Sequence, residues 1–276
     1  MSKLLVASIL GLSLSLLAQS QAPSPTRAND RPDEQLPVRV GGGIPVAPET
    51  TARVPRLPDG TVDLSGTWLG GGPNNDFERE GGLQPGEVVR LLRPWAKALM
   101  DTRTDAQDPQ NFCMPMGVPR QATAFPIRFV QNFTHTAATH IFILQEGNIH
   151  SYRQIFMDGR THPDDPTPTW LGHSIGRWER DTLVVDSIGF NDKFWFDRRG
   201  FPHTEQLHVI ERWTRIDMGH LENKVTIDDP GAYSRPFTAT FTARLTAPGD
   251  ELMEYICAEN NQYGLPGGNP NPYAGK

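Results

Sequence analysis

Short runs of alternating apolar and polar residues dominate the second half of the chain. They are rich in β-branched and aromatic side chains, and turns such as Glu146-Gly147-Asn148 and Pro248-Gly249-Asp250 separate them. The predicted strands are residues 127–134, 139–145, 149–157, 171–179, 182–187, 205–215, 221–228, 237–245 and 252–257. Strands that follow one another through short turns form antiparallel meanders, which close into a barrel or stack as a sandwich.

The pattern therefore predicts an all-β, mainly antiparallel fold, with an up-and-down barrel preferred and a β-sandwich as the alternative. One short N-terminal helix is predicted over residues 87–100, with an apolar stripe that Pro94 interrupts. Strands and helices do not alternate along the chain, which argues against a parallel nucleotide-binding sheet.

The two ends of the chain differ in composition from its middle. Residues 1–20 combine Lys3, an apolar stretch and a small-residue motif at Ala18-Gln19-Ser20, as a signal peptide does. Residues 21–58 predict a disordered Pro-rich linker and residues 264–276 a flexible tail, which leaves residues 59–263 as the barrel domain. We therefore expect a periplasmic or secreted protein without an integral membrane anchor.

Charge and cysteine content narrow the choice of partners. The chain has 26 Lys and Arg against 32 Asp and Glu, for a formal net charge of −6. An acidic chain without a basic stripe is a poor ligand for nucleic acid, so we expect a small-molecule partner instead. In an exported chain, Cys113 and Cys257 predict a disulfide bond, with two unrelated buried thiols as the alternative.

Two resemblances support this picture. Gly66-Thr67-Trp68 resembles the G-x-W that begins the first strand of lipocalin barrels. A wider set of motifs resembles a large, mostly uncharacterised family of exported bacterial β-rich proteins, which implies an exported barrel but no particular reaction. Arg180 stands where that family has glycine, and Thr204 where it has serine. The motifs are Leu64-Ser65-Gly66-Thr67-Trp68, Cys113-x-Pro115-x-Gly117-x-Pro119-Arg120, Met157-Asp158-Gly159-Arg160-x-His162-Pro163, the run from Gly172 to Asp186, and Glu254-x-x-Cys257-x-Glu259-Asn260.

One motif matches the G-x-S-x-G pattern of serine hydrolases. Gly172-His173-Ser174-Ile175-Gly176 has the spacing, and Ser174, Asp186 and His203 have the chain order of a triad. A nucleophile elbow needs a helix after the serine, however, and here another predicted strand follows. We favour glycines that let a strand bend or a ligand approach closely.

Two carboxylates fall on one face of the predicted strand 205–215. Alternation places Glu205 and Glu211 in step with Leu207, Val209 and Trp213. If that face is inward, burial raises the pKa of both carboxyls and makes one a usable acid near neutral pH. The alternative is a solvent-exposed rim, or pairing with Arg212 or Arg215.

A second pair is predicted from two different strands. On one predicted strand Asp186 shares a face with Thr182 and Val184. On another, Arg153 shares a face with Ile155. On inward faces, Asp186 and Arg153 form either a buried ion pair or a clamp for a substrate oxygen. The residues alone favour the ion pair.

Four histidines, His162, His173, His203 and His208, lie in the same stretch of chain. We favour His173 and His203 for proton transfer, because both lie beside turns and imidazole titrates near neutral pH. The spacing of His203, His208 and Glu211 matches no metal motif, so no metal is predicted. Further acid/base candidates are Asp158, in an Asp-Gly-Arg turn, and Asp197.

Aromatic side chains are dense between residues 152 and 201. Tyr152, Trp170 and Trp195 are the candidates for contact with an apolar or ring-shaped ligand. The alternative is a satellite cluster that packs a long loop against the barrel.

These candidates predict an enzyme that transfers protons without a cofactor, as a lyase, isomerase or hydrolase acting on a small cyclic or aromatic molecule. A carboxylate or histidine removes the proton, and Arg153 steadies the developing charge. The alternative is a non-catalytic, lipocalin-like carrier of an apolar ligand. A carrier needs an apolar cavity with few titratable groups, whereas this sequence places many together.

Overall fold

Alternation of burial marks several strands of the computed structural model, which describes residues 52–123, 125–134, 137–147 and 151–259. Along the last strand, Phe237, Ala239, Phe241 and Ala243 are buried, and the threonines between them face outward. The strands are β1 Thr67–Gly70, β2 Ile127–Thr134, β3 Ala137–Gln145, β4 Tyr152–Phe156, β5 His173–Glu179, β6 Thr182–Ile188, β7 His208–Arg215, β8 His220–Asp228 and β9 Phe237–Leu245.

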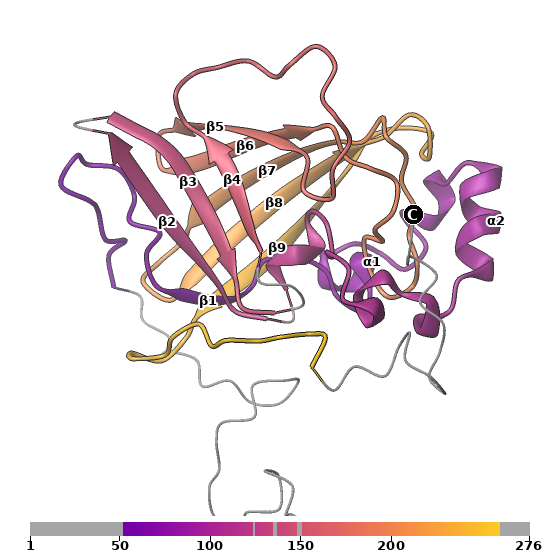
Figure 1. Cartoon of the computed structure of the whole chain (residues 1–276), viewed down its shortest axis with the longest axis horizontal. Coiled ribbons are helices and arrows are strands. Elements are labelled where there is room, and N and C mark those ends of the chain that lie inside the picture. The colour runs from indigo at the N-terminus through magenta and orange to yellow at the C-terminus, as the bar shows by residue number, and fades with distance from the viewer. Residues whose placement is uncertain (1–51, 124, 135–136, 148–150, 260–276) are drawn as a thin grey trace, which may run out of the picture. The chain divides into compact units, whose positions relative to one another are not determined.

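The nine strands of the described chain form a closed barrel in sequence order, with β9 paired to β1 (Figure 1). The all-β barrel prediction is thereby confirmed over the sandwich. Neighbouring strands are antiparallel except for β4 and β5, which are parallel. An odd number of strands cannot close with every pair antiparallel, because strand direction must return to its starting sense around the ring. The β4–β5 pair supplies the required parallel step.

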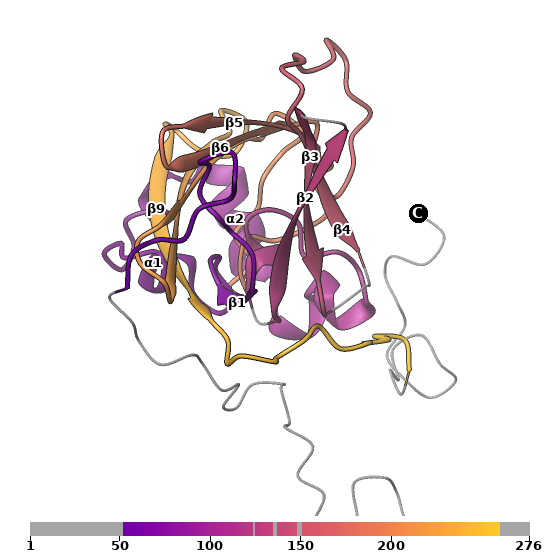
Figure 2. The same cartoon turned by 90° about the vertical axis from the view of Figure 1, so that its left-hand side faces the viewer.

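A long crossover makes this parallel pair possible. Residues 157–172 leave the end of β4 and rise above the barrel before they return to the start of β5 (Figures 1 and 2). Parallel strands need such a connection, since a tight hairpin reverses the direction of the chain. The register places Ile155 beside Ser174.

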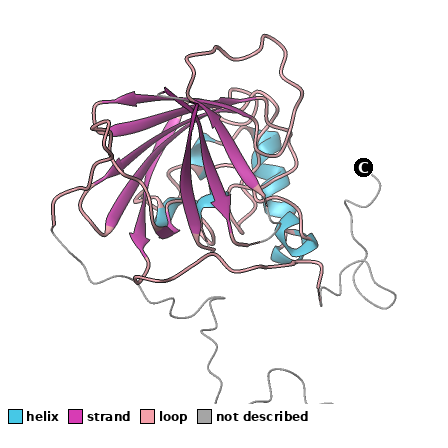
Figure 3. Ribbon diagram, turned by 60° about the vertical axis from the view of Figure 1, so that its left-hand side comes forward, coloured by secondary structure: helices cyan, strands magenta, loops and turns pink. Residues whose placement is uncertain are grey.

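The helices gather at one end of the barrel (Figure 3). They are α1 Phe77–Glu80 and α2 Pro94–Thr102, with 3₁₀ turns at Val89–Leu91, Asp105–Gln107, Pro109–Phe112 and Arg120–Ala122. We predicted that Pro94 interrupts a helix. In the structure Pro94 instead begins α2, where its missing N–H costs no hydrogen bond. No helix within the described ranges has the length and apolarity needed to cross a membrane.

Two apolar clusters fill the barrel domain. One, at the end that carries the helices, includes Val209 and Val225, and the other includes Trp213 and Leu221. On β7 and β8 the buried residues between these clusters are Glu211 and Asn223, so a polar layer separates them.

Several predicted bounds differ from those of the structure: the strand predicted over residues 205–215 begins at His208, and the helix predicted from residue 87 begins at Pro94. Residues 252–257 form no strand. Residues 52–58, which we assigned to the linker, contact the barrel: Arg56 pairs with Asp181 at 2.6 Å, and Val54 packs against the cluster that contains Trp213. The predicted signal peptide, most of the linker (residues 21–51) and the tail lie outside the described residues.

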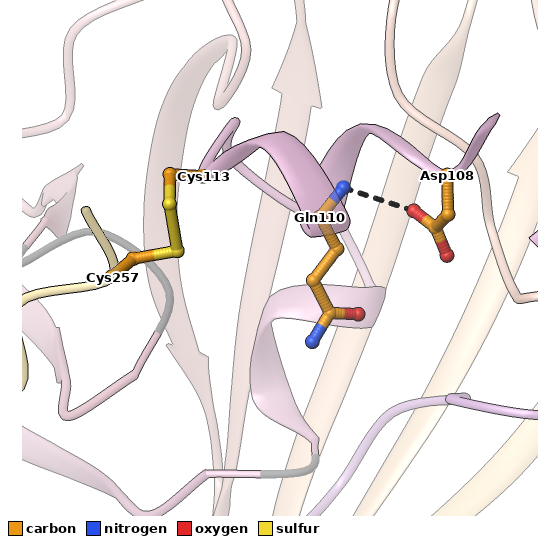
Figure 4. The surroundings of a disulfide bond; sticks show 4 residues. All are labelled: Asp108, Gln110, Cys113 and Cys257. Atoms are coloured by element: carbon orange, nitrogen blue, oxygen red, sulfur yellow. Dashed lines mark hydrogen bonds between the residues drawn. A yellow bond between two sulfur atoms is a disulfide. The ribbon is translucent and has the colours of Figure 1, made fainter. Parts of the chain in front are cut away.

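The predicted disulfide between Cys113 and Cys257 is confirmed (Figure 4). The two Cα atoms are 5.6 Å apart, within the range that a disulfide spans without backbone movement. Cys113 ends the turn Pro109–Phe112, in which the Asp108 side chain accepts a hydrogen bond from the N–H of Gln110. The bond therefore ties the segment after β9 to the segment that precedes β2.

Candidate functional site

Arg153 occupies the polar layer inside the barrel. Its guanidinium donates from Nε to Ser174 Oγ at 3.0 Å, from Nη2 to Ser187 Oγ at 2.7 Å, and from Nη1 to Glu211 Oε2. Asn223 Nδ2 donates to the other oxygen of Glu211 at 3.3 Å. These side chains come from β4, β5, β6, β7 and β8, so the layer connects five strands.

This layer is closed to solvent. Arg153 and Glu211 are each 1% exposed, and their neighbours Ile155, Val185 and Trp213 are 0% exposed. A side chain that lines a cavity wide enough for water retains accessible area, so these side chains leave no such space beside them. Ser174 Oγ is also buried here, bonded to Arg153 and Ser187, away from any substrate.

Asp186 is not the partner of Arg153, contrary to our expectation. On β6 the inward side chains are Leu183, Val185 and Ser187, which leaves Asp186 on the outer wall. The partner of Arg153 is Glu211 instead. The inward orientation predicted for Glu211 is correct, but Glu205 is exposed in a turn before β7 begins and does not share that face.

On the outer wall, Asp186 belongs to a chain of hydrogen bonds that contains three histidines. His208 Nε2 lies 2.7 Å from Asp186 Oδ1, and His162 Nε2 lies 3.2 Å from the same oxygen. His162 Nδ1 in turn lies 2.9 Å from His173 Nδ1. The strands β5, β6 and β7 supply His173, Asp186 and His208, and the crossover supplies His162.

These contacts fix the tautomers of the neutral rings. An ionised carboxylate only accepts hydrogen bonds, so His162 Nε2 must carry the proton that faces Asp186. The other nitrogen of neutral His162 is then an acceptor, and His173 Nδ1 must donate to it. His173 Nε2 is left as an unprotonated, basic nitrogen.

The electrostatics agree with this assignment. The hydrogen bond from His208 lowers the pKa of Asp186, which keeps that carboxyl ionised, and the same bond raises the pKa of His208. Partial burial and the charge of Arg160 lower the pKa of His173, and a protonated His162 would lower it further. His173 is therefore neutral at pH 7, as a general base requires.

Phe156 and Arg160 stand beside His173. The ring of Phe156 stacks on His173 with centroids 5.0 Å apart, and the Arg160 guanidinium lies 3.8 Å from the centroid of the same Phe156 ring. Asp158 pairs with Arg160, and these hydrogen bonds lower the pKa of Asp158 to about 2. Asp158 is thus a permanent carboxylate that orients Arg160.

Asp197 and His203 lie elsewhere, in the cluster at the end of the barrel that carries the helices. Burial raises the pKa of Asp197 to about 7 and lowers that of His203 to about 4. The ring of His203 packs against Phe194 with centroids 3.9 Å apart. Both groups are enclosed in the core and do not join His173. His203 is neutral at pH 7, whereas a pKa of about 7 leaves Asp197 about half protonated there.

The three predicted ligand-binding aromatics do not converge. Tyr152 is 57% exposed on the outer face of β4, where it contacts Phe142. Trp170 packs against the cluster that contains Val209, and Trp195 is buried beneath Arg103 at 4.7 Å.

Sequence reasoning named His162 and His208 without assigning them a role, and it omitted Arg160 and Phe156 as site residues. The signal available was the run Asp158-Gly159-Arg160-x-His162, which places a cation and an imidazole in one turn before the strand of His173. Nothing local in the run shows that the crossover returns beside β5.

Within the described ranges, no group of three or more His, Cys, Asp or Glu side chains has the arrangement of a metal site. In the histidine chain, both nitrogens of His162 already face hydrogen-bond partners, so no set of lone pairs converges on one point.

The fold and the site define a closed nine-stranded β-barrel with a histidine–aspartate hydrogen-bond chain on its outer wall. The chain matches no protein-family model, no curated protein and no solved structure at a significant level.

Proposed function

We propose that the protein is an exported enzyme that transfers protons in a small-molecule substrate without a cofactor, with His173 as the general base. The observation that carries this proposal is the hydrogen-bonded chain from His173 through His162 to Asp186. When His173 Nε2 takes a proton, the chain stabilises the resulting positive charge by connecting it to a carboxylate. Removal of a proton from a substrate, or from a water molecule, is a shared first step of lyases, isomerases and hydrolases.

The disulfide supports the proposed periplasmic or secreted location. Disulfides persist in oxidising compartments and are rare in the reducing cytosol. The Cys113–Cys257 bond therefore agrees with the leader that the sequence predicts in residues 1–20.

The carrier alternative finds less support. A carrier of the lipocalin type holds its ligand inside the barrel. Here the ion pair between Arg153 and Glu211 and the ring of Trp213 occupy that interior, each 0–1% exposed. The titratable and partly exposed chemistry lies on the outer wall.

The test uses 4-nitrophenyl acetate, an activated ester whose hydrolysis imidazole promotes. We expect His173→Asn to reduce the rate of ester hydrolysis by at least about tenfold. This factor is smaller than the roughly 10²–10⁴-fold that general-base catalysis contributes with a true substrate. His220→Asn is the matched control, because His220 also pairs with an aspartate, Asp217, at 2.9 Å on a turn. Equal rates in the wild type and in His173→Asn contradict the proposal.

A further inference from the structure

One aromatic ring joins the proposed base to a cation. Phe156 lies on the outer wall at the end of β4, where its ring stacks on His173 at an interplanar angle of 25°. The guanidinium carbon of Arg160 lies 3.8 Å from the centroid of the same ring. Arg160 and His173 are therefore neighbours across a single side chain.

The guanidinium of Arg160 uses two of its nitrogens to bind Asp158 and leaves the third available to a ligand. Its Nε donates to Asp158 Oδ1 at 2.9 Å and its Nη2 donates to Asp158 Oδ2 at 2.5 Å. The remaining nitrogen, Nη1, makes no hydrogen bond to any residue that the structure describes. The side chain is 43% exposed, so this open edge is within reach of a small ligand.

The carboxylates near this position are already engaged, so Nη1 is the donor of Arg160 that is left for an anion. Asp158 pairs with the Nε and Nη2 edge of Arg160, and Asp186 is engaged by His162 and His208. The charge of Arg160 also contributes to the lowered pKa of His173, which agrees with their proximity. A guanidinium fixed by a carboxylate and an aromatic face loses less conformational entropy when it binds a second anion.

We propose that Arg160 is a substrate-binding residue that receives a carboxylate through Nη1, so that the substrate is a small carboxylic acid. This inference rests on the proposed function for the identity of the neighbouring base. Arg160 thereby takes the charge-binding role that the sequence suggested for Arg153, which is enclosed with Glu211.

A pair of probes of similar shape and different charge tests the proposal. Binding of benzoate and of benzamide is followed by the shifts of the His173 ring resonances. We expect benzoate to bind the wild type at least about tenfold more tightly than benzamide, since a charge-assisted hydrogen bond is worth more than a neutral one. In Arg160→Gln the preference disappears. In Arg177→Gln it persists, because Arg177 is a comparably exposed arginine paired with a carboxylate on β5.

Equal binding of the two probes to the wild type overturns the proposal. So does an unchanged preference in Arg160→Gln, or no binding of benzoate up to its solubility. Because Arg160 is a half-exposed loop residue, its substitution leaves the barrel folded, and an unchanged melting temperature checks this. If benzoate binds through Arg160 but His173→Asn hydrolyses the ester at the wild-type rate, the anion site is supported. Only the proposed function is then contradicted.

Discussion

Glu211 and Arg153 form an ion pair at the centre of the barrel, where each side chain is 1% exposed. The pair lies between the two apolar clusters, and Ser174, Ser187 and Asn223 satisfy further polar atoms around it. Taking two charges out of water is costly, and the compensation depends on both partners remaining in place.

Replacing Glu211 with Gln should therefore reduce the free energy of unfolding by about 3–5 kcal/mol, because it leaves the Arg153 charge buried and unpaired. Urea denaturation measures this loss. The control is Glu179→Gln, whose carboxylate pairs with two arginines but is 39% exposed, and we expect a much smaller loss because solvent screens exposed pairs. Equal losses in the two variants contradict a stabilising role of the interior pair.

Asp197 and His203 should make opposite contributions to the pH dependence of stability. The pKa of Asp197 rises from 3.8 to about 7 on folding, so between these values the unfolded chain releases a proton that the native state keeps. Stability from this group falls as pH rises. The pKa of His203 falls from 6.5 to about 4, so in that window only the unfolded chain binds the proton, and stability rises with pH.

The two effects nearly cancel in the wild type between about pH 4 and 6.5, and single variants separate them. Relative to wild type, the free energy of unfolding of Asp197→Asn should increase by about 1.4 kcal/mol per pH unit as pH rises through this window. The free energy of unfolding of His203→Gln should decrease by about as much per pH unit, again relative to wild type. Denaturation curves at a series of pH values measure these differences, and stability profiles parallel to wild type show the assignments to be wrong.

The sequence predicted the barrel where alternation is unambiguous. The bounds predicted for β2 and β9 are those of the structure. In β9 apolar and polar positions alternate without interruption between clear turns. The face of Asp186 was not predictable in this way. It follows Leu183, Val184 and Val185, three apolar residues that give no indication of which side of the strand is inward.

Other features depend on contacts between distant segments. Glu205 fell outside the strand because Asp229 accepts hydrogen bonds from the N–H and hydroxyl of Thr204, which holds a turn before β7. Alternation carries no information about such a turn. His162 reaches Asp186 only because the crossover returns beside β5, and no local pattern encodes that path.

Loss of the disulfide should destabilise the protein substantially. Cys113 and Cys257 are 144 residues apart in sequence, and in the chain-entropy account a crosslink of this span stabilises by about 5 kcal/mol. We expect the Cys113→Ser, Cys257→Ser double variant to unfold at a markedly lower urea concentration. Dithiothreitol should shift the wild type toward the same midpoint and leave the double variant unchanged. A wild type that is insensitive to the reductant would argue that the bond contributes little.

The tautomers of His162 and His173 test the account most directly, because the assignment of the base depends on them. Long-range ¹H–¹⁵N correlation spectra of the protein labelled with ¹⁵N-histidine, recorded near neutral pH, distinguish the two neutral forms of each ring. We predict the Nε2–H form for His162 and the Nδ1–H form for His173, with His173 Nε2 unprotonated. In Asp186→Asn this preference should weaken, while the spectrum of His220 stays as in the wild type. A His173 ring that carries its proton on Nε2 would leave no basic nitrogen for substrate and would contradict the proposed mechanism.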